Sequence, residues 1–490
     1  MVTGGFKGDR YEPLATNEVY DIHMSSLEVL SKVGVVIKDE KAKKLLDNAG
    51  AIIDDKKSIA YIPEHLVEEA IDRAPSTVTL CARDRENDLR LHDQRVYLGT
   101  GGAALYVLDM ENGARRQALK QDVQDFAIVV NALDNVHFYM IPVYPSDVPA
   151  ETADRHRYEI ALRYSRKHVM GGVYTRQGAL DVIKMAEAVA GGPEELARRP
   201  LISLITCAVS PLTWDDNYIQ ILIEAAEHSI PVSIPSEAMA GGTGPATLAG
   251  SLVLQNAETL SGIVIAELAK PGAPVLYGTV ATIMDPRTGV YASGAIESAL
   301  LNAAASQMAQ YYEIPIYATA GLTDSKVIDV QAGYEKAMTT LLVALSGANY
   351  IHDAAGLIES ALTVSYEQLV IDNDILGMVM RGVRGIVVND ESLAVEVIRA
   401  VGPGGHYLSQ KHTLRHAMTE YFMPTLSDRS KRENWERLVP RDIQARAKES
   451  VKKILASQIP SPLPSHINET LKGIVLQADR RRLQSAPIIG

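Results

Sequence analysis

Polar side chains crowd the stretch that follows the apolar run Pro315–Ala318. If that run is a buried strand of a parallel sheet, its carboxyl end is a common place for groups that bind or position a small molecule. Lys326 is the nearest amine able to form a Schiff base, although it lies several residues beyond the run. Asp329 stands where the next helix should begin, so capping that helix is the alternative role for its carboxylate. The polar residues of the stretch are Thr319, Thr323, Asp324, Ser325, Lys326, Asp329 and Gln331.

The same pattern recurs along the chain, with tyrosines and hydroxyl groups following other apolar runs. Tyrosine rings with few fixed charges suit a small organic cation, which is attracted to ring faces. A single such residue is more often a packing or capping residue than a ligand contact. The residues at these ends are Tyr97, Thr100, Tyr144, Tyr174, Ser210, Ser236, Glu237, Thr279, Thr282, Met284, Asp285, His352 and Asp353.

Metal and nucleophilic chemistry have weaker signals. His412 and His416 lie one helical turn apart with Glu420 nearby, which could make half of a metal site, but a surface or interface helix is the better explanation for them. We therefore predict no metal. The two cysteines, Cys81 and Cys207, stand in apolar surroundings and indicate buried thiols in a reducing compartment.

Eight short apolar runs, each followed by an amphipathic segment, predict the architecture. Strands that alternate with helices indicate a parallel sheet, and eight such units from 97 to 356 suit a closed (β/α)8 TIM barrel, which takes about 250 residues. A doubly wound open sheet is the alternative. The runs begin at Tyr97, Val136, His168, Leu201, Pro231, Pro274, Pro315 and Tyr350.

We expect a helical N-terminal extension over 1–96, the barrel over 97–374 and a helical C-terminal region over 375–490, with a break at 460–465. The net charge of −12 excludes a broad basic surface for nucleic acid. No run approaches the roughly 18 apolar residues of a membrane span, and the first residues lack the apolar core of a signal peptide. These features predict a cytoplasmic protein.

Several long motifs resemble the trimethylamine methyltransferase superfamily, whose members are corrinoid-dependent (β/α)8 barrel enzymes. The similarity extends over nearly the whole chain. The segments that carry it are Met239–Pro245, Asp324–Lys336, Ser346–Gly356, Tyr366–Asp374 and Val401–Leu408, together with Pro211-Leu.

The founding members of this superfamily carry pyrrolysine, and the position nearest to it here is Val327. The resemblance therefore implies the branch without pyrrolysine, whose members use quaternary amines such as glycine betaine, proline betaine, carnitine and γ-butyrobetaine. A quaternary ammonium is already four-coordinate, so SN2 loss of one methyl group expels a neutral amine and requires mainly positioning. Glycine betaine is our first candidate.

A betaine needs partners for both of its ends. We predict that Tyr97, Tyr144 and Tyr174 meet the ammonium, and that His352, helped by the Thr319 and Ser236 hydroxyls, meets the carboxylate. A core imidazole bonded to a neighbouring carbonyl is the alternative for His352. The residues expected to face the corrinoid or to form the catalytic loop are Asp324, Ser325, Val327, Asp329, Gln331 and His406.

The resemblance also implies a cob(I)alamin cofactor carried by a separate corrinoid protein. The chain has no Asp-x-His-x-x-Gly motif with which to bind a corrinoid itself. A barrel lyase using Lys326 and a quaternary-amine binding protein without turnover are the alternative functions. A homo-oligomer is expected because relatives of this size commonly assemble.

Overall fold

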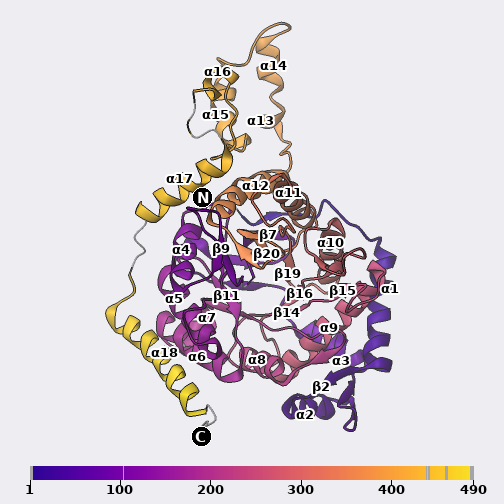
Figure 1. The fold of residues 1–490 in the computed structure, drawn as a ribbon. Coiled ribbons are helices and arrows are strands. Elements are labelled where there is room, and N and C mark those ends of the chain that lie inside the picture. Colours follow the sequence, from indigo (N-terminus) through magenta and orange to yellow (C-terminus); the bar gives the residue numbers. More distant parts are fainter. Residues whose placement is uncertain (1–3, 103, 438, 440–441, 458–461, 486–490) are drawn as a thin grey trace.

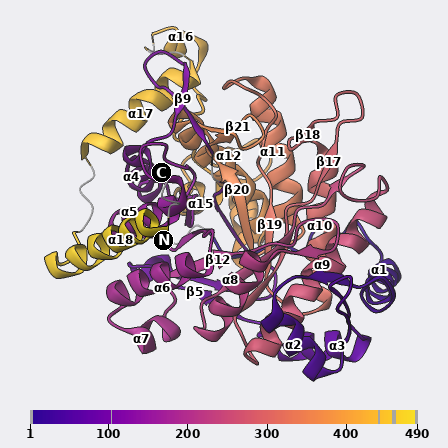
Figure 2. The same ribbon diagram turned by 60° about the horizontal axis from the view of Figure 1, so that its bottom comes forward.

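The computed structural model is an α/β protein in which helices surround a central group of strands (Figure 1). It describes the chain except for residues 1–3, 103, 438, 440–441, 458–461 and 486–490. Figure 2 shows the same arrangement from a second direction, with the strands inside and the helices outside.

Each of the eight predicted runs contains a strand, and the eight strands pair in parallel. Neighbours in the sheet are consecutive strands of this set except β7 and β20, the first and the last, which also pair; a doubly wound sheet would instead reverse its strand order at a switch point. The doubly wound alternative is therefore wrong. In sheet order the strands are β7 (Arg95–Thr100), β20 (Tyr350–Ala355), β19 (Ile316–Thr319), β16 (Val275–Thr279), β14 (Val232–Ser236), β12 (Ile202–Ile205), β11 (Val169–Gly172) and β10 (Tyr139–Met140).

The helices that connect these strands bury one side against them. The longest, α9, is 22 residues and so apolar that its length and composition would allow it to cross a membrane, but 72% of its most apolar stretch is buried within the fold. It is a core helix. The covering helices are α4 (Lys120–Asn131), α5 (Ala153–Tyr164), α6 (Arg176–Ala190), α7 (Pro193–Arg198), α8 (Asp216–Glu227), α9 (Leu248–Ala269), α10 (Ile296–Tyr311), α11 (Val330–Leu345) and α12 (Tyr366–Arg384).

The N-terminal region is helical only in part. It holds α1 (Thr16–Glu28), α2 (Glu40–Ala49) and α3 (Glu64–Arg73), but also the short strands β2 (Val35–Ile37), β3 (Ile52–Asp54) and β4 (Ile59–Tyr61), which form a small sheet with β13 (Thr213–Trp214). These strands of three residues are too short to show the periodicity on which the helical prediction rested. The remaining strands here are β1 (Phe6–Lys7), β5 (Val78–Leu80) and β6 (Leu89–Leu91).

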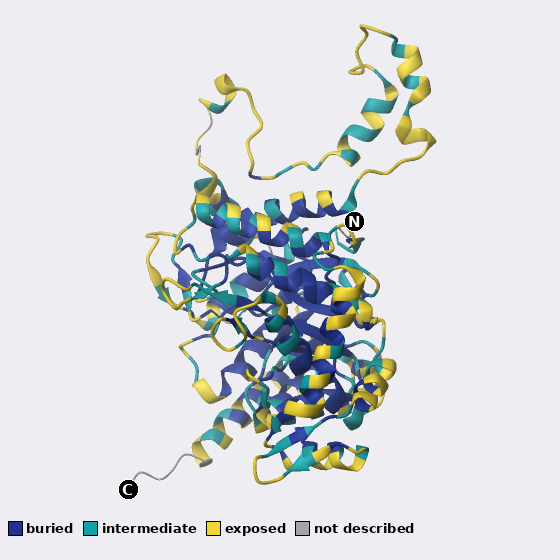
Figure 3. Cartoon of the chain, turned by 90° about the vertical axis from the view of Figure 1, so that its right-hand side faces the viewer, coloured by how far each residue is buried: buried dark blue, intermediate teal, exposed yellow. Residues whose placement is uncertain are grey.

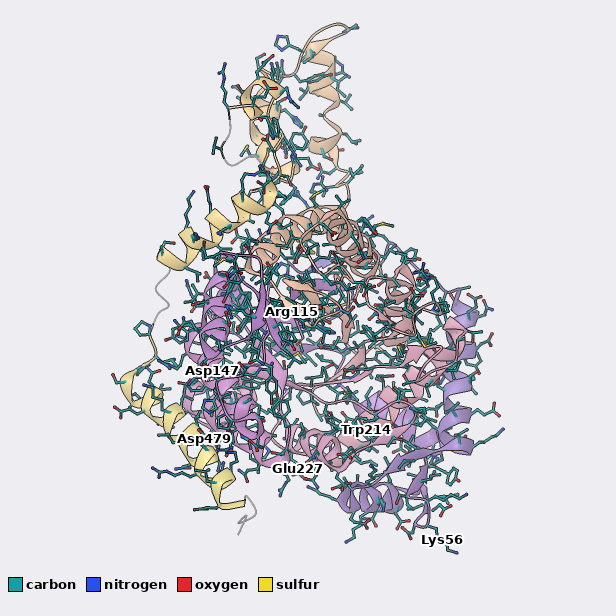
Figure 4. The ribbon with its side chains drawn as sticks, viewed as in Figure 1. Lys56, Arg115, Asp147, Trp214, Glu227 and Asp479 are labelled. Carbon is teal, nitrogen blue, oxygen red and sulfur yellow. The ribbon has the colours of Figure 1, made fainter. Side chains whose placement is uncertain are left out.

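Short strands after the main ones build a rim at the carboxyl end of the sheet. Arg115 of β9 pairs with Glu359, 2.7 Å away, and its guanidinium lies 3.9 Å from the ring centre of Tyr106 (Figure 4). These contacts join two segments of the rim. The rim strands are β8 (Tyr106–Leu108), β9 (Arg115–Gln117), β15 (Met239–Ala240), β17 (Thr282–Met284), β18 (Tyr291–Ala292), β21 (Leu357–Ile358) and β22 (Thr363–Val364).

The C-terminal region begins inside α12, so the predicted boundary at residue 374 falls within a helix. The last helix, α18, lies against α5, where Asp479 accepts a hydrogen bond from Thr152, with donor and acceptor 2.6 Å apart (Figure 4). Part of the predicted break at 460–465 lies outside the described residues. The helices of the region are α13 (Asp390–Leu393), α14 (Val395–Val401), α15 (Lys411–Glu420), α16 (Arg432–Trp435), α17 (Ile443–Ser457) and α18 (Ser465–Ser485).

Candidate active site

His352 is the centre of a buried polar group at the carboxyl ends of β19 and β20. Its ring stacks on Tyr317, with centroids 4.1 Å apart and planes 14° apart. Nε2 shares a short hydrogen bond with Thr319 Oγ1, and Nδ1 lies 3.1 Å from Asp353 Oδ2. Both ring nitrogens therefore face protein groups.

Asp353 has a strained backbone. Its φ is +62°, a left-handed conformation that few residues other than glycine adopt, and the pairing of β20 with β7 shifts register between Ile351 and Ala355. The buried Oδ1 has no hydrogen-bond partner among the described residues. A Cβ on Gly101 would lie 2.1 Å from Oδ1, so this approach requires glycine. Strain of this kind and an unpaired carboxylate oxygen are typical of a functional position.

Glu237 follows β14 and is exposed to solvent. Protein nevertheless surrounds the carboxyl group, and this burial raises the pKa of Glu237. The nearby His352 lowers that pKa in part, and the charge of Asp353 raises it further. The side chain of Glu237 thus touches solvent while protein groups crowd its carboxyl group.

Tyr291, on the rim strand β18, completes this group. Burial and the charges of Glu237, Asp353 and Asp324 raise the pKa of its phenol, so it remains protonated at neutral pH. We call Glu237, His352, Asp353 and Tyr291 the acidic cluster. Its two carboxyl groups with a half-buried phenol favour a cation as the ligand.

Tyr144 and Tyr174 form a second group, at the carboxyl ends of β10 and β11. Their ring centroids are 5.7 Å apart. Burial, and to a smaller extent the neighbouring Tyr174, raise the pKa of Tyr144 to about 12. Arg157 of α5 donates from Nη1 to Tyr174 Oη at 3.1 Å and from Nη2 to the Ile141 carbonyl at 2.8 Å.

The guanidinium of Arg157 is buried, and no carboxylate of the described residues lies within ion-pair distance of it. Its Nε also lacks a hydrogen-bond partner there. A buried cation without a counter-ion is costly, and an anion beside Tyr174 would reduce that cost. We call Tyr144, Tyr174 and Arg157 the tyrosine–arginine group.

Two of the predicted ligands are engaged elsewhere. Ser236 donates to Glu258 at 2.5 Å, and the same carboxyl group accepts from Ser210 and from the Leu212 amide, both at 2.7 Å. Burial raises the pKa of Glu258. Tyr97 lies against His137, with ring centroids 5.9 Å apart, in the inner apolar cluster beside the N-terminal segment. The structure therefore places Tyr97 in a different cluster from Tyr144 and Tyr174.

The loop after β19 is held by its own hydrogen bonds. Asp324 accepts from the Ser293 and Gly294 amides and from the Ser360 hydroxyl, which fastens the loop to two rim segments. Asp329 caps α11 by accepting from the Ala332 amide at 2.9 Å, as the alternative for this residue predicted.

The other predicted loop residues divide into buried and exposed positions. Ser325 is buried and donates to the Val327 carbonyl, and Gln331 donates to Glu335 on the same helix. Val327 is 53% exposed at the rim. His406 lies between α14 and α15, two helices that project beyond α12 (Figure 1).

The structure supports neither a Schiff-base lysine nor a metal site. Lys326 is exposed and donates to the Asp324 carbonyl, while the buried Lys336 pairs with Asp372 at 3.2 Å. In the part of the chain that is described, no three His, Cys, Asp or Glu side chains form a metal-binding group. His412 and His416 lie side by side on the exposed helix α15, with ring centroids 4.3 Å apart.

Several residues of the site were not selected from the sequence. Glu237 and Asp353 follow predicted strands, so their positions were available, but nothing in the pattern separated them from capping carboxylates. Arg157 and Glu258 lie within helices, where a charged residue normally faces solvent, and no sequence signal marked them.

Comparison with known proteins reveals full-length relatives. The trimethylamine methyltransferase (MTTB) family matches residues 6–484. A protein of Desulfitobacterium hafniense strain DCB-2 named trimethylamine methyltransferase is 39% identical over 94% of this chain and 93% of its own, and one of Methanosarcina barkeri strain Fusaro with the same name is 36% identical over 95% and 94%. A glycine betaine methyltransferase of Desulfitobacterium hafniense strain Y51 is 33% identical over 96% and 97%.

A solved structure is also similar. The monomethylamine methyltransferase of Methanosarcina barkeri aligns over 99% of this chain and 96% of its own, with 12% identity and a TM-score of 0.48.

Proposed function

The chain belongs to the trimethylamine methyltransferase family, and from this premise we propose that it transfers a methyl group from a quaternary amine to the cob(I)alamin of a separate corrinoid protein. Glycine betaine is the first candidate, ahead of proline betaine, carnitine and γ-butyrobetaine. The relative with 39% identity is named for trimethylamine and the one with 33% for glycine betaine, so identity alone does not choose the substrate.

The acidic cluster is the observation that carries the proposal. Glu237 and Asp353 bring two carboxyl groups to the carboxyl end of the sheet, where Glu237 is exposed to solvent. A quaternary ammonium has no N–H to donate, so charge and ring faces must hold it. The acids replace the acid-poor, tyrosine-lined pocket that we expected, and they fit a cation better.

The chemistry requires little of the protein beyond positioning. The corrinoid supplies the nucleophilic cobalt that accepts the methyl group. The acidic cluster holds the ammonium, and the neutral amine that leaves loses the charge attraction that held it. Val327, on the exposed rim, stands nearest to the position of pyrrolysine in the founding members, and its apolar side chain offers no electrophile to activate a tertiary amine.

The carboxylate of a betaine requires a different partner from the one predicted. Both nitrogens of His352 face Thr319 and Asp353, and the neighbouring carboxyl groups would repel a carboxylate. Tyr174, backed by the buried cation Arg157, offers a hydroxyl with positive charge behind it. We therefore place the ammonium at the acidic cluster and the carboxylate at the tyrosine–arginine group.

We further propose that the eight parallel strands close into a (β/α)8 barrel. Support comes from a parallel bridge between Gly99 and Phe138 and from the His137 amide, which donates to the Leu98 carbonyl at 2.7 Å. Phe138 also stacks on Tyr350 across the same seam, with ring centroids 3.6 Å apart. Closure would bring the two groups of the site around one opening.

A spectroscopic assay of methyl transfer tests the function. Purified protein is mixed with cob(I)alamin, free or on a corrinoid protein, and with glycine betaine, proline betaine, carnitine, γ-butyrobetaine or trimethylamine separately. Methylcobalamin and the matching demethylated amine are expected from a betaine. Turnover of trimethylamine alone would overturn the leaving-group argument, and no turnover of any donor beside an active control enzyme would favour binding without chemistry.

A further inference from the structure

Cys207 is the cysteine that lies among polar side chains. Buried residues fill the centre of the molecule (Figure 3), and Cys81 is one of them, in the apolar core. Cys207 instead follows β12 and is half-buried, and among the described residues it belongs to neither apolar cluster. The prediction of two buried thiols is therefore confirmed for Cys81 and wrong for Cys207. Core packing, the usual role of a free cysteine, does not explain Cys207.

The thiol of Cys207 reaches Glu237 in the acidic cluster. Its Sγ donates to Oε1 with the two atoms 3.9 Å apart, a long hydrogen bond of the weak kind that thiols make. Partial burial and the charges of Glu237 and Glu258 raise the pKa of the thiol well above its usual value, so it remains protonated at neutral pH. A protonated thiol is a poor nucleophile but donates to a carboxylate. Cys207 is therefore suited to holding the carboxyl group of Glu237.

The backbone fixes this approach. Ala208 and Ser236 form a parallel bridge, which brings the segments after β12 and β14 side by side. The carboxyl group of Glu258 on α9 accepts from Ser210 in the first segment and from Ser236 in the second. The thiol and the carboxyl group each belong to the residue next to the bridge, so these contacts hold the two groups at a constant separation.

A second carboxyl group, that of Asp353, points to a ligand at the same place. Asp353 is 4% exposed, and its Oδ1 has no hydrogen-bond partner among the described residues. Burial raises the pKa of the Tyr317 phenol, and the nearby Asp353, Glu237 and Cys207 raise it further, so all three lie around one ring. A buried carboxylate oxygen without a partner is costly, and a cation beside Glu237 would reduce that cost.

We propose that Cys207 is a positioning residue of the cation-binding end, where its S–H group holds Oε1 of Glu237. The other oxygen of this carboxylate and Oδ1 of Asp353 then face the ammonium together, with the sulfur beside the bound methyl groups. The assignment rests on the proposed function, which places the ammonium at the acidic cluster. A quaternary ammonium presents only methyl groups to its surroundings, and a small, polarisable, uncharged thiol can contact them without competing for the charge.

Cys207 also favours the charged form of Glu237. A hydrogen bond donated to a carboxylate lowers its pKa, and here this opposes the larger effect of burial. His352 acts in the same direction as Cys207, and Asp353 acts in the opposite direction. Loss of the thiol should therefore move the pH dependence of cation binding to higher pH. The other titratable groups near Glu237 and Cys207 are Tyr218 of α8, Glu258 of α9, Tyr291 of β18 and Tyr317 of β19.

Isothermal titration of the full chain with tetramethylammonium chloride, between about pH 5 and pH 9, tests the positioning role. Cys207→Ala should weaken binding about threefold at neutral pH, the value of one weak hydrogen bond, and shift the pH profile upward. Cys207→Ser, whose hydroxyl can donate, should restore the wild-type profile. Cys81→Ala, the same change at the buried cysteine, is the matched control and should leave the profile unchanged.

Thiol labelling tests the contact without any ligand. Methyl methanethiosulfonate converts a thiol into a methyl disulfide and releases methanesulfinate, and mass spectrometry of peptides distinguishes Cys207 from Cys81. Glu237→Gln removes a charge that opposes ionisation of the Cys207 thiol, so the labelling rate of Cys207 should rise roughly fivefold while that of Cys81 stays constant. Saturating tetramethylammonium should slow the labelling of Cys207 in the wild-type chain and leave that of Cys81 unchanged.

Each negative result has a distinct meaning. Wild-type affinity and pH profile in Cys207→Ala, or an unchanged labelling rate in Glu237→Gln, would show that the thiol does not hold Glu237. Equal labelling of Cys207 with and without bound tetramethylammonium would place the thiol away from the cation. These results would overturn the role of Cys207 alone. A wild-type chain that binds no tetramethylammonium would overturn that role together with the cation-binding end of the proposed function.

Discussion

The acidic cluster and the tyrosine–arginine group occupy the same edge of the sheet with opposite charge. Glu237 and Asp353 follow β14 and β20, while Arg157 supports Tyr174 after β11. Among the described residues, no lysine or arginine pairs with the carboxyl groups of the first group, and no carboxylate pairs with the guanidinium of the second. Two unbalanced ends of opposite sign are suited to a zwitterion.

Removing the charge of Asp353 should have the largest effect. Asp353→Asn is expected to lower kcat/KM for every quaternary amine about 100-fold, because loss of a buried counter-charge costs about 2 to 5 kcal/mol, roughly one and a half to three and a half powers of ten. Steady-state methylcobalamin formation measures this. A change in kcat/KM of less than about twofold, in a variant with normal circular dichroism, would show that Asp353 does not hold the cation.

The tyrosine–arginine group should distinguish ligands that carry a carboxylate from ligands that do not. Tyr174→Phe is expected to weaken glycine betaine binding about 10-fold, the value of one charge-assisted hydrogen bond, and to leave tetramethylammonium binding unchanged. Isothermal titration of both ligands checks it. Tyr144→Phe, which removes a hydroxyl bonded to the Ala150 carbonyl, is the matched control. If Tyr174→Phe weakened the binding of both ligands equally, the carboxylate and the ammonium would not bind at separate groups.

Glu237 should make cation binding depend on pH. Burial raises the pKa of its carboxyl group, so the charge that attracts a cation forms only as pH rises through that higher pKa. The Kd for tetramethylammonium should therefore fall as pH rises, and Glu237→Gln should abolish this dependence. An unchanged pH profile in Glu237→Gln would assign the titration to another group.

The same shift has a consequence for stability. A folded-state pKa above the unfolded value means that the carboxyl group stabilises the fold fully below the unfolded pKa, and that this contribution is lost as pH rises through the folded pKa. Glu237→Gln should therefore raise Tm at pH 8 and have less effect at pH 4. Thermal unfolding at the two pH values checks the sign, and an equal shift at both would contradict it.

The smallest effect is expected at the loop after β19. Asp329→Ala should destabilise the protein by about 1 kcal/mol through loss of the helix cap and leave the KM for the donor unchanged. Asp329→Asn, which preserves capping, should restore stability. A large loss of activity in the stable Asn variant would give this carboxylate the catalytic role that capping now explains.

The sequence predicted the positions of the eight strands along the chain well because each is a short, buried apolar run with polar residues after it. It also located His352 and Thr319, which follow such runs and bond one another. It assigned Ser236 and Tyr97 to the substrate because strand position does not reveal what a side chain contacts. Ser236 reaches Glu258 on α9, and Tyr97 faces the N-terminal segment, and both contacts join residues remote in sequence.

Arg157 and Asp353 show what a local pattern misses. Arg157 lies in a helix of ordinary composition, and its burial depends on how α5 packs against β10 and β11. Asp353 owes its position to an irregular backbone conformation and to the absence of a side chain on Gly101. These two residues lie at the ends of different strands and meet only in the folded sheet.

A crystal structure with glycine betaine bound tests the two-ended site most directly. The account predicts the trimethylammonium within about 6 Å of the acidic cluster, the range of cation recognition by rings and charges, and the carboxylate at about 2.7 Å from Tyr174 Oη. A betaine bound with its carboxylate on His352, or bound away from both groups, would contradict it.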